Sequence, residues 1–385
     1  MLSVKIWLCY FVCLVAGANN ITIPTLTGPF NVGTTILEVT DYTRQDPWAK
    51  TPQPRNIVIS LFYPTTELPY SEPLSMQEHK CRRAVQLPPN VATYLENHYA
   101  VSNGSLHNII TRACLDAPIS RPFRPLLLFT PGFQSSRLMY SDILIEIASY
   151  GWTIASLDHP YETGIVEYPD GRVIYGLPLD DSNSTIVKNI DIRTADVVSV
   201  LNALSNSTVV DRIPGFARHE PLESRFDTNR VGVFGHSLGG ATALSVLAND
   251  TRFVVGANSD GSYWGSEIQK GTAAPFMALT SKGHDRTNDQ SWADTWPNLR
   301  GFKREYSVRG AKHNDFTDIP LILQLWAYGI PPNSGDFLGT INGTRITAIQ
   351  RAYLTSLFRR VLKGANDGLL DGIGMDEWPE VEVGV

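Results

Sequence analysis

The sequence is short of positive charge and has no long apolar run. Its 385 residues carry 32 Lys and Arg against 38 Asp and Glu, a formal net charge of −6, with no basic stripe. We therefore expect no nucleic-acid binding, because recognition of a phosphate backbone needs clustered Lys and Arg. The apolar stretch from Ile6 to Ala16 is about 11 residues long. A bilayer span needs roughly 20, so we expect no transmembrane segment.

Metal and cofactor motifs are also missing. The pair His284-Asp285 has no further ligands at a spacing that would hold zinc. Neither a Rossmann glycine fingerprint nor a P-loop occurs. We therefore expect no metal and no cofactor.

Only four cysteines occur, and two of them lie in an N-terminal segment typical of a secretory signal peptide. Lys5 supplies the positive end, the apolar stretch follows, and Gly17-Ala18 offers small residues for cleavage. The alternative, a membrane anchor, is disfavoured by the length of the stretch. We predict a signal peptide at 1–18, whose removal takes Cys9 and Cys13 with it.

The mature chain would then keep Cys81 and Cys114. Two cysteines in an oxidising compartment indicate one disulfide, the alternative being two buried free thiols. Acceptor sequences for N-glycosylation agree with secretion. They lie at Asn103, Asn183, Asn206, Asn249 and Asn342, and also at Asn20 near the expected new N-terminus. We predict a secreted, extracellular glycoprotein.

The N-terminal third reads as two strands followed by an irregular insertion. Residues 34–41 and 56–63 alternate or run apolar with β-branched residues, which predicts an antiparallel hairpin. Residues 64–122 are rich in proline and contain both mature cysteines. We interpret them as an insertion between strands and a candidate lid.

From residue 125 onward, apolar strands alternate with amphipathic helices. This alternation predicts a doubly wound, mostly parallel sheet of the α/β class with helices on both faces. We expect a single domain over 19–372, followed by a loose acidic tail at 373–385.

The strongest motif is Gly235-His236-Ser237-Leu238-Gly239, which lies directly between a predicted strand and a predicted helix. It matches G-x-S-x-G, the nucleophile elbow of the α/β-hydrolase fold, in the context that gives the motif its meaning. The turn is so tight that the flanking positions need glycine. We therefore predict Ser237 as the nucleophile, the alternative being a plain serine in a glycine-rich turn.

An ester carbonyl attacked by Ser237 becomes an oxyanion that needs fixed hydrogen-bond donors. In this fold one donor is the backbone N–H after the nucleophile, here Leu238, and the second comes from the loop after the third strand. That loop reads Thr130-Pro-Gly-Phe-Gln134, and Gly132 allows close approach of the backbone. We predict the N–H of Phe133 as the second donor.

The base must follow the nucleophile, because the chain order in this fold is Ser, acid, His. Only His284 and His313 do so, and His313 lies just beyond the last predicted strand. We predict His313 as the base. For the acid, Asp260 and Asp285 each follow a strand, and topology alone leaves both open.

The segments GHSLGGATALSVLANDTRFVVGANSDGSYW and YSVRGAKHNDFTD resemble the secreted platelet-activating factor acetylhydrolase family. The likeness covers most of residues 27–330. It implies the acid at Asp260, with nucleophile, base and oxyanion donors at Ser237, His313, Leu238 and Phe133. The sequence departs from the family at Pro131, where the family usually has histidine. It also departs in the insertion at 64–122 and in residues 158–163, and these two segments resemble a fungal branch of the family.

The resemblance implies a calcium-independent esterase, similar to a 1-alkyl-2-acetylglycerophosphocholine esterase, that removes short or oxidised sn-2 acyl groups from phospholipids. The alternatives are a general carboxylesterase or cutin-like polyester hydrolase with the same triad and, more distantly, a non-catalytic binding glycoprotein. Ester or phospholipid substrates are the expected partners. Tyr263, Trp264, Trp292 and Trp296, together with the apolar stretch from Ile319 to Tyr328, are candidates for contact with lipid surfaces, although packing in the core is the preferred interpretation.

Overall fold

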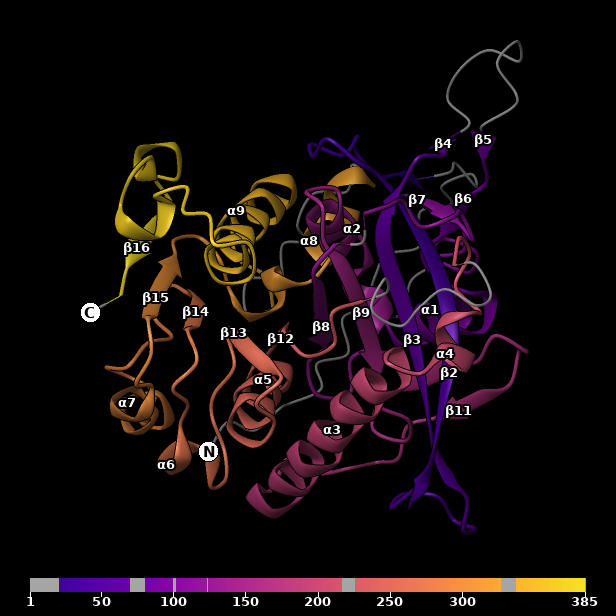
Figure 1. The fold of residues 1–385 in the computed structure, drawn as a ribbon, viewed down its shortest axis with the longest axis horizontal. Coiled ribbons are helices and arrows are strands. Elements are labelled where there is room, and N and C mark those ends of the chain that lie inside the picture. Colours follow the sequence, from indigo (N-terminus) through magenta and orange to yellow (C-terminus); the bar gives the residue numbers. More distant parts are fainter. Residues whose placement is uncertain are drawn as a thin grey trace.

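The structure is a computed structural model. It describes residues 21–69, 80–99, 102–122, 124–216, 226–326 and 337–384. Its centre is one mixed β-sheet to which strands from both ends of the described chain contribute (Figure 1). The strand order is β1 (Ile21–Thr22), β7 (Ile109–Leu115), β2 (Asn31–Gln45), β3 (Pro54–Thr65), β9 (Thr153–Asp158), β8 (Leu126–Thr130), β12 (Val231–His236), β13 (Phe253–Ser259), β14 (Phe276–Ser281), β15 (Lys303–Val308) and β16 (Val381–Val383), with β6 (Arg83–Val85) paired to β7.

Strands β9, β8, β12, β13, β14 and β15 run parallel to one another. Their apolar runs fit this arrangement, because a parallel sheet is covered by helices on both faces. Every residue of β8 and β12 is buried. The predicted hairpin is also present, since β2 and β3 pair antiparallel and β3 joins the parallel strands at β9. The expected sheet is confirmed.

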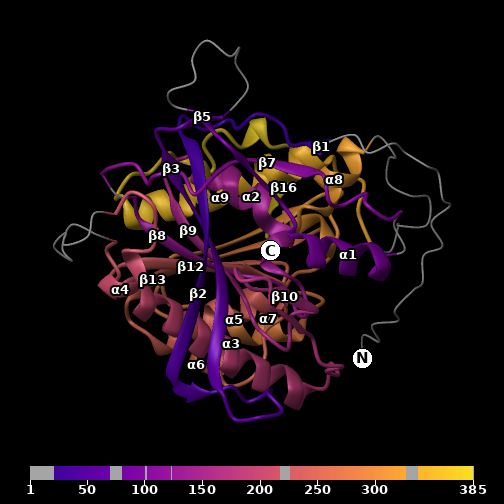
Figure 2. The same ribbon diagram turned by 90° about the vertical axis from the view of Figure 1, so that its right-hand side faces the viewer.

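Helices cover both faces of the sheet, as Figure 2 shows from the side. One face carries α2 (Ser141–Ala148), α8 (Ile319–Leu325) and α9 (Gly343–Leu362). The other carries α3 (Asn183–Leu204) and α5 (Leu238–Asn249). On the first face Phe358 of α9 packs between Phe234 of β12 and Trp152. The sheet is therefore the middle of three layers, with a separate apolar core on each side.

The remaining elements of the described chain are shorter. They are β4 (Leu68–Pro69), β5 (Lys80–Cys81), α1 (Pro89–His98), η2 (Arg137–Tyr140), β10 (Ile165–Glu167), β11 (Val173–Tyr175), α4 (Ser207–Val210), α6 (Glu267–Lys270), α7 (Gln290–Thr295), η4 (Trp296–Asn298), η5 (His313–Phe316), η7 (Leu369–Asp371) and η8 (Met375–Glu377).

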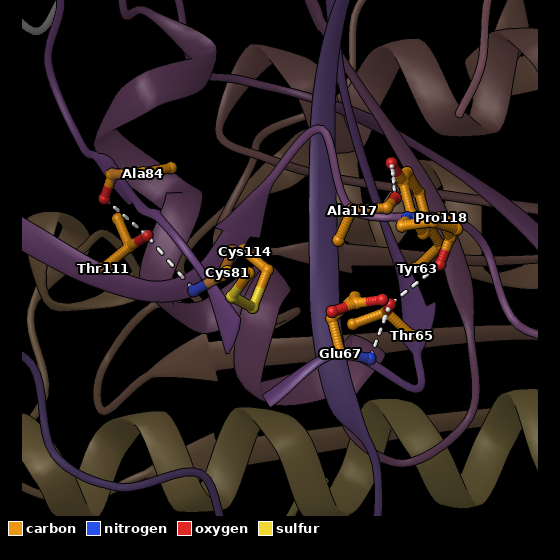
Figure 3. The surroundings of a disulfide bond; sticks show 10 residues. Tyr63, Thr65, Glu67, Cys81, Ala84, Thr111, Cys114, Ala117 and Pro118 are labelled. Carbon is orange, nitrogen blue, oxygen red and sulfur yellow. Dashed lines mark hydrogen bonds between the residues drawn. A yellow bond between two sulfur atoms is a disulfide. The ribbon is translucent and has the colours of Figure 1, made fainter. Parts of the chain in front are cut away.

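The described part of the 64–122 insertion extends the edge of the main sheet, because β7 pairs in parallel with β2. The predicted disulfide between Cys81 and Cys114 is present, with the two Cα atoms 5.4 Å apart (Figure 3). Beside it, the hydroxyl of Tyr63 donates a hydrogen bond of 2.9 Å to the carbonyl of Ala117. The disulfide therefore joins β5 to β7, a strand of the main sheet. Action of the insertion as a lid stays a prediction.

The prediction of a loose C-terminal tail is wrong for its described part. Strand β16 pairs antiparallel with β15 at the edge of the sheet. Val381 is buried, and Arg345 of α9 forms an ion pair of 2.8 Å with Glu380. The acidic composition concealed this, because Val381 and Val383 alternate with charged residues as in an edge strand.

The predicted signal peptide, with Cys9, Cys13 and the acceptor at Asn20, lies outside the described residues. The other five acceptor asparagines, at 103, 183, 206, 249 and 342, are all exposed. No helix within the described ranges is long and apolar enough to cross a membrane.

Candidate active site

Ser237 occupies a strained turn between β12 and α5. Its backbone has φ +56° and ψ −126°, a conformation that a residue with a side chain rarely adopts. The neighbouring glycines make the turn possible, because a Cβ on Gly239 would overlap the carbonyl of Thr130, and one on Gly235 would overlap Gly239. The N–H of Ser237 donates a hydrogen bond of 2.8 Å to the carbonyl of Ser259. The motif thus has the strand–turn–helix context that its sequence predicts.

The structure brings His313 and Asp260 to this serine. The Nε2 atom of His313 lies 2.9 Å from Oγ of Ser237, and Nδ1 lies 2.8 Å from Oδ2 of Asp260. His313 begins η5 after β15, and 45% of its side chain is exposed. Asp260 follows β13 and is buried. Burial alone would raise the pKa of Asp260, but hydrogen bonds from His284 and His313 hold that pKa well below its usual range.

The other predicted acid, Asp285, has different partners. Its Oδ1 atom accepts hydrogen bonds from the backbone N–H and the hydroxyl of Thr287, at 2.7 and 2.5 Å. These bonds close a local turn after β14. Of the two aspartates that topology left open, Asp260 is the one that contacts His313.

The predicted oxyanion loop passes directly beside Ser237. A Cβ built on Gly132 would lie 3.3 Å from Cβ of Ser237. The guanidinium of Arg193 on α3 donates to the carbonyl of Pro131 at 2.6 Å and to that of Gly132 at 2.9 Å. In a trans peptide the N–H points away from the carbonyl of the same unit. The N–H of Phe133 is therefore aimed away from Arg193.

A fully buried cluster of charged and polar side chains is bonded to this loop. Nε of Arg193 bonds to Oε2 of Glu162 at 2.6 Å, and Oε1 of Glu162 accepts from the N–H of Gln134 at 3.1 Å. His159 lies 2.8 Å from the hydroxyl of Thr130. Its other ring nitrogen lies 2.9 Å from Asp196, which in turn pairs with Arg55 at 2.7 Å. Each charge has a partner, as burial requires.

A second set of bonds links the loop to His313. Tyr140 lies at the centre: its hydroxyl accepts the N–H of Gly132 at 3.1 Å and lies 2.9 Å from Nδ1 of His236. The Nε2 atom of His236 lies 2.9 Å from the carbonyl of His313. Burial and the neighbouring His313 lower the pKa of His236 to about 3. The neutral ring therefore donates from Nε2 to His313 and accepts from Tyr140.

Sequence reasoning missed three of these residues. Arg193 and Tyr140 lie in two different segments predicted to be helical, and no motif marks either residue. His284 was dismissed because it has no metal-ligand partners, yet its Nδ1 atom lies 3.0 Å from Oδ1 of Asp260. Among the described residues, no group of three or more His, Cys, Asp or Glu could hold a metal ion.

Comparisons with known proteins point to one family of ester hydrolases. A family model described as platelet-activating factor acetylhydrolase, isoform II, matches residues 15–328. The chain is 29% identical over 401 residues to a "Probable 1-alkyl-2-acetylglycerophosphocholine esterase" of Arthroderma benhamiae, covering 94% of each chain. It is 22% identical over 326 residues to the platelet-activating factor acetylhydrolase of Cavia porcellus, covering 79% of this chain and 71% of that one.

Among solved structures, a ferulic acid esterase from Streptomyces cinnamoneus matches with a TM-score of 0.77 and 30% sequence identity. The match covers 95% of this chain and 99% of that one. These relatives are ester hydrolases, which sets aside the alternative of a non-catalytic binding glycoprotein. The chain belongs to the platelet-activating factor acetylhydrolase (isoform II) family of α/β-hydrolases and is a carboxylic ester hydrolase.

Proposed function

We propose that this enzyme removes short acyl groups from the sn-2 position of phospholipids through a Ser237–His313–Asp260 triad. The observation that carries the mechanism is the pair of contacts at His313, 2.9 Å to Ser237 and 2.8 Å to Asp260. A base between a hydroxyl and a carboxylate takes the serine proton in one tautomer only, with Nδ1–H on Asp260 and Nε2 free to accept. The strained turn presents the hydroxyl at the end of β12.

The proposed reaction has two steps. Oγ of Ser237 attacks the ester carbonyl while Nε2 of His313 accepts its proton, and the N–H groups of Leu238 and Phe133 stabilise the oxyanion. The proton then passes to the departing alcohol, which leaves an acyl-serine. In the second step His313 takes a proton from water, the hydroxide oxygen attacks the acyl carbon, and Ser237 recovers its proton as the acid departs.

Substrate profiling of the purified enzyme with phosphatidylcholines of increasing sn-2 chain length tests the substrate. We expect kcat/KM to be highest for acetyl and to fall steeply as the chain lengthens. Equal rates for long and short acyl groups would contradict the proposal. Support for a phospholipid comes from the family and from the Arthroderma relative.

Hydrolysis of esters of aromatic acids is a second candidate, favoured by the match to the ferulic acid esterase. A shallow surface hollow of about 440 Å³ is formed by α1 and Tyr175, and one residue separates it from the loop over 130–134. Gly164 connects the two, because its N–H donates to the carbonyl of Gln134 at 3.0 Å and a Cβ on it would lie 2.9 Å from the hydroxyl of Tyr94. The hollow is lined by Asn90, Thr93, Tyr94, Asn97, His98 and Tyr175.

The two candidates differ in what Tyr94→Ala would do. If the hollow binds a feruloyl group, the variant raises KM for methyl ferulate and leaves hydrolysis of a short-acyl phospholipid unchanged. If phospholipids are the substrate and the hollow is not used, methyl ferulate is hydrolysed poorly by both the variant and the wild type.

We also propose that the enzyme is a secreted glycoprotein. The exposed acceptor asparagines and the disulfide support this. Expression of the full chain in a eukaryotic host should deliver it to the medium, beginning near residue 19, with a mass that falls on treatment with an N-glycosidase. Retention inside the cell with an intact N-terminus would contradict the proposal.

A further inference from the structure

The carboxylate of Asp260 serves two histidines. Oδ2 faces His313, whereas Oδ1 faces Nδ1 of His284 at 3.0 Å. Oδ1 also accepts the backbone N–H of Ser281 at 2.7 Å and its hydroxyl at 2.9 Å. A carboxylate with this many donors is held in one orientation, so Oδ2 is fixed for His313.

His284 itself lies between two carboxylates. Its Nε2 atom is 2.9 Å from Oδ2 of Asp289, the residue that caps α7. With an ionised carboxylate on each nitrogen, both nitrogens must carry hydrogen, and the ring is a cation. Burial opposes this charge, but the bonds to Asp260 and Asp289 outweigh burial and raise the pKa of His284 to about 10. The ring of Trp292 packs against it, with centroids 5.1 Å apart.

This places a permanent positive charge on the acid of the triad. A lone Asp260 would stabilise the protonated form of His313 fully. An imidazolium on its other oxygen offsets part of that stabilisation, so His313 loses its proton more easily. The charges in the row Asp289–His284–Asp260–His313 alternate in sign when His313 is protonated. The positive charge of His284 therefore weakens the stabilisation that Asp260 gives to protonated His313.

We propose that His284 is a positioning residue of the triad: it fixes Asp260 from the side opposite His313, and its positive charge extends catalysis to lower pH. The inference rests on the proposed function, because it assigns a role relative to that triad. It adds a residue that acts through Asp260 and does not touch the substrate.

Other titratable groups lie near His284 and His313, and none of them is substituted in the test. His236 of β12 faces His313 and is neutral, with its pKa lowered to about 3 by burial and by His313. Asp315 of η5 has its pKa raised by burial and accepts the N–H of Lys312. Asp285 and Lys282 lie on the His284 side. A shift that follows substitution of His284 alone is therefore due to His284.

The test compares His284→Gln with wild type over pH 4 to 9, using kcat/KM for p-nitrophenyl acetate. Glutamine keeps an N–H donor for Asp260 but carries no charge. We expect the acidic limb of the profile to move upward by about one pH unit, because one nearby charge is lost. His284→Lys restores a charge, so its limb should return toward that of wild type.

The matched control is His107→Gln. His107 also faces a carboxylate, Glu96 at 3.7 Å, but its contacts are in the edge insertion. Its profile should coincide with that of wild type. An acidic limb that does not move in His284→Gln, or that moves equally in His284→Lys, would overturn the inference and leave His284 a structural residue.

Titration of the His313 imidazole by NMR separates this inference from the proposed function. In the Ser237→Ala background, the pH midpoint of the His313 ring signals should move upward in His284→Gln, by the same amount as the acidic limb of the pH profile. If Ser237→Ala kept full activity while this shift was present, the triad mechanism would fail and the electrostatic coupling would stand. If activity depended on Ser237 and the shift was absent, only the inference would fail.

Discussion

The two sides of Ser237 are built differently. On the oxyanion side, the loop over 130–134 rests on a cluster of charges that is buried throughout, with Arg193 at its centre. On the base side, His313 is 45% exposed and its supporting His284 is 22% exposed. In the proposed mechanism, the donors that must not move are held by groups that water does not reach, whereas the group that exchanges protons remains open to solvent. The following substitutions probe this difference.

The largest effect is expected on the base side from Asp260→Asn. The amide cannot hold His313 in the tautomer that leaves Nε2 free, so kcat should fall by about 10⁴-fold. Asparagine has nearly the same size and shape as aspartate and leaves no cavity, so we expect the variant to remain folded. Asp285→Asn is the control, and its kcat should stay within about twofold of wild type because its side chain bonds to Thr287 and not to His313. Equal losses in the two variants would contradict the assignment of the acid.

On the oxyanion side, Arg193→Leu should lower kcat by about 10²–10³-fold, since the peptide before Phe133 loses its anchor. The same change leaves Glu162 buried without its cation, which costs about 3–5 kcal/mol of stability. The double variant Arg193→Leu with Glu162→Leu should regain part of the stability but not the activity. Denaturant unfolding and kcat measured on the folded fraction give the two quantities. Recovery of activity in the double variant would show that the guanidinium does not orient the loop.

Tyr140→Phe tests the bonds that join the two sides. Loss of the hydroxyl leaves Nδ1 of His236 and the N–H of Gly132 without their shared partner. Each buried polar group left unpaired costs about 1–3 kcal/mol. We expect kcat to fall about tenfold, because part of this cost appears as a loss of loop order. A variant with unchanged kcat and stability would show that the two sides are held independently.

The smallest effect on catalysis is expected from Cys81→Ser with Cys114→Ser, at the sheet edge. The bond closes a loop with a sequence separation of 33, so its removal should lower the free energy of unfolding by about 3–4 kcal/mol. The kcat of the folded protein should not change. A large fall in kcat would indicate that the edge segment takes part in the site.

Some of the site residues could be predicted from the sequence and others could not. Ser237 and His313 could be predicted because the elbow needs glycines at fixed spacing and the chain order limits the base to two histidines. The strands were visible in their β-branched runs. Asp260 could not be separated from Asp285 by topology, since both follow strands, and needed the family resemblance.

The roles of Arg193 and His284 could not be predicted from the sequence, for a physical reason. Arg193 acts across 61 residues on the carbonyl of Gly132, and His284 acts across 24 residues on Asp260. Neither spacing is a motif, because the fold alone brings the partners together. The C-terminal strand was missed because composition reports average charge, whereas pairing depends on the alternation around Val381 and Val383.

The central claim is that Ser237 is a nucleophile activated by His313. Labelling with a fluorophosphonate probe, followed by peptide mapping, tests it most directly. We predict one label per chain, at Ser237, with a rate that falls by at least about 10³-fold in His313→Ala. A label on another residue, or an unchanged labelling rate in His313→Ala, would contradict it.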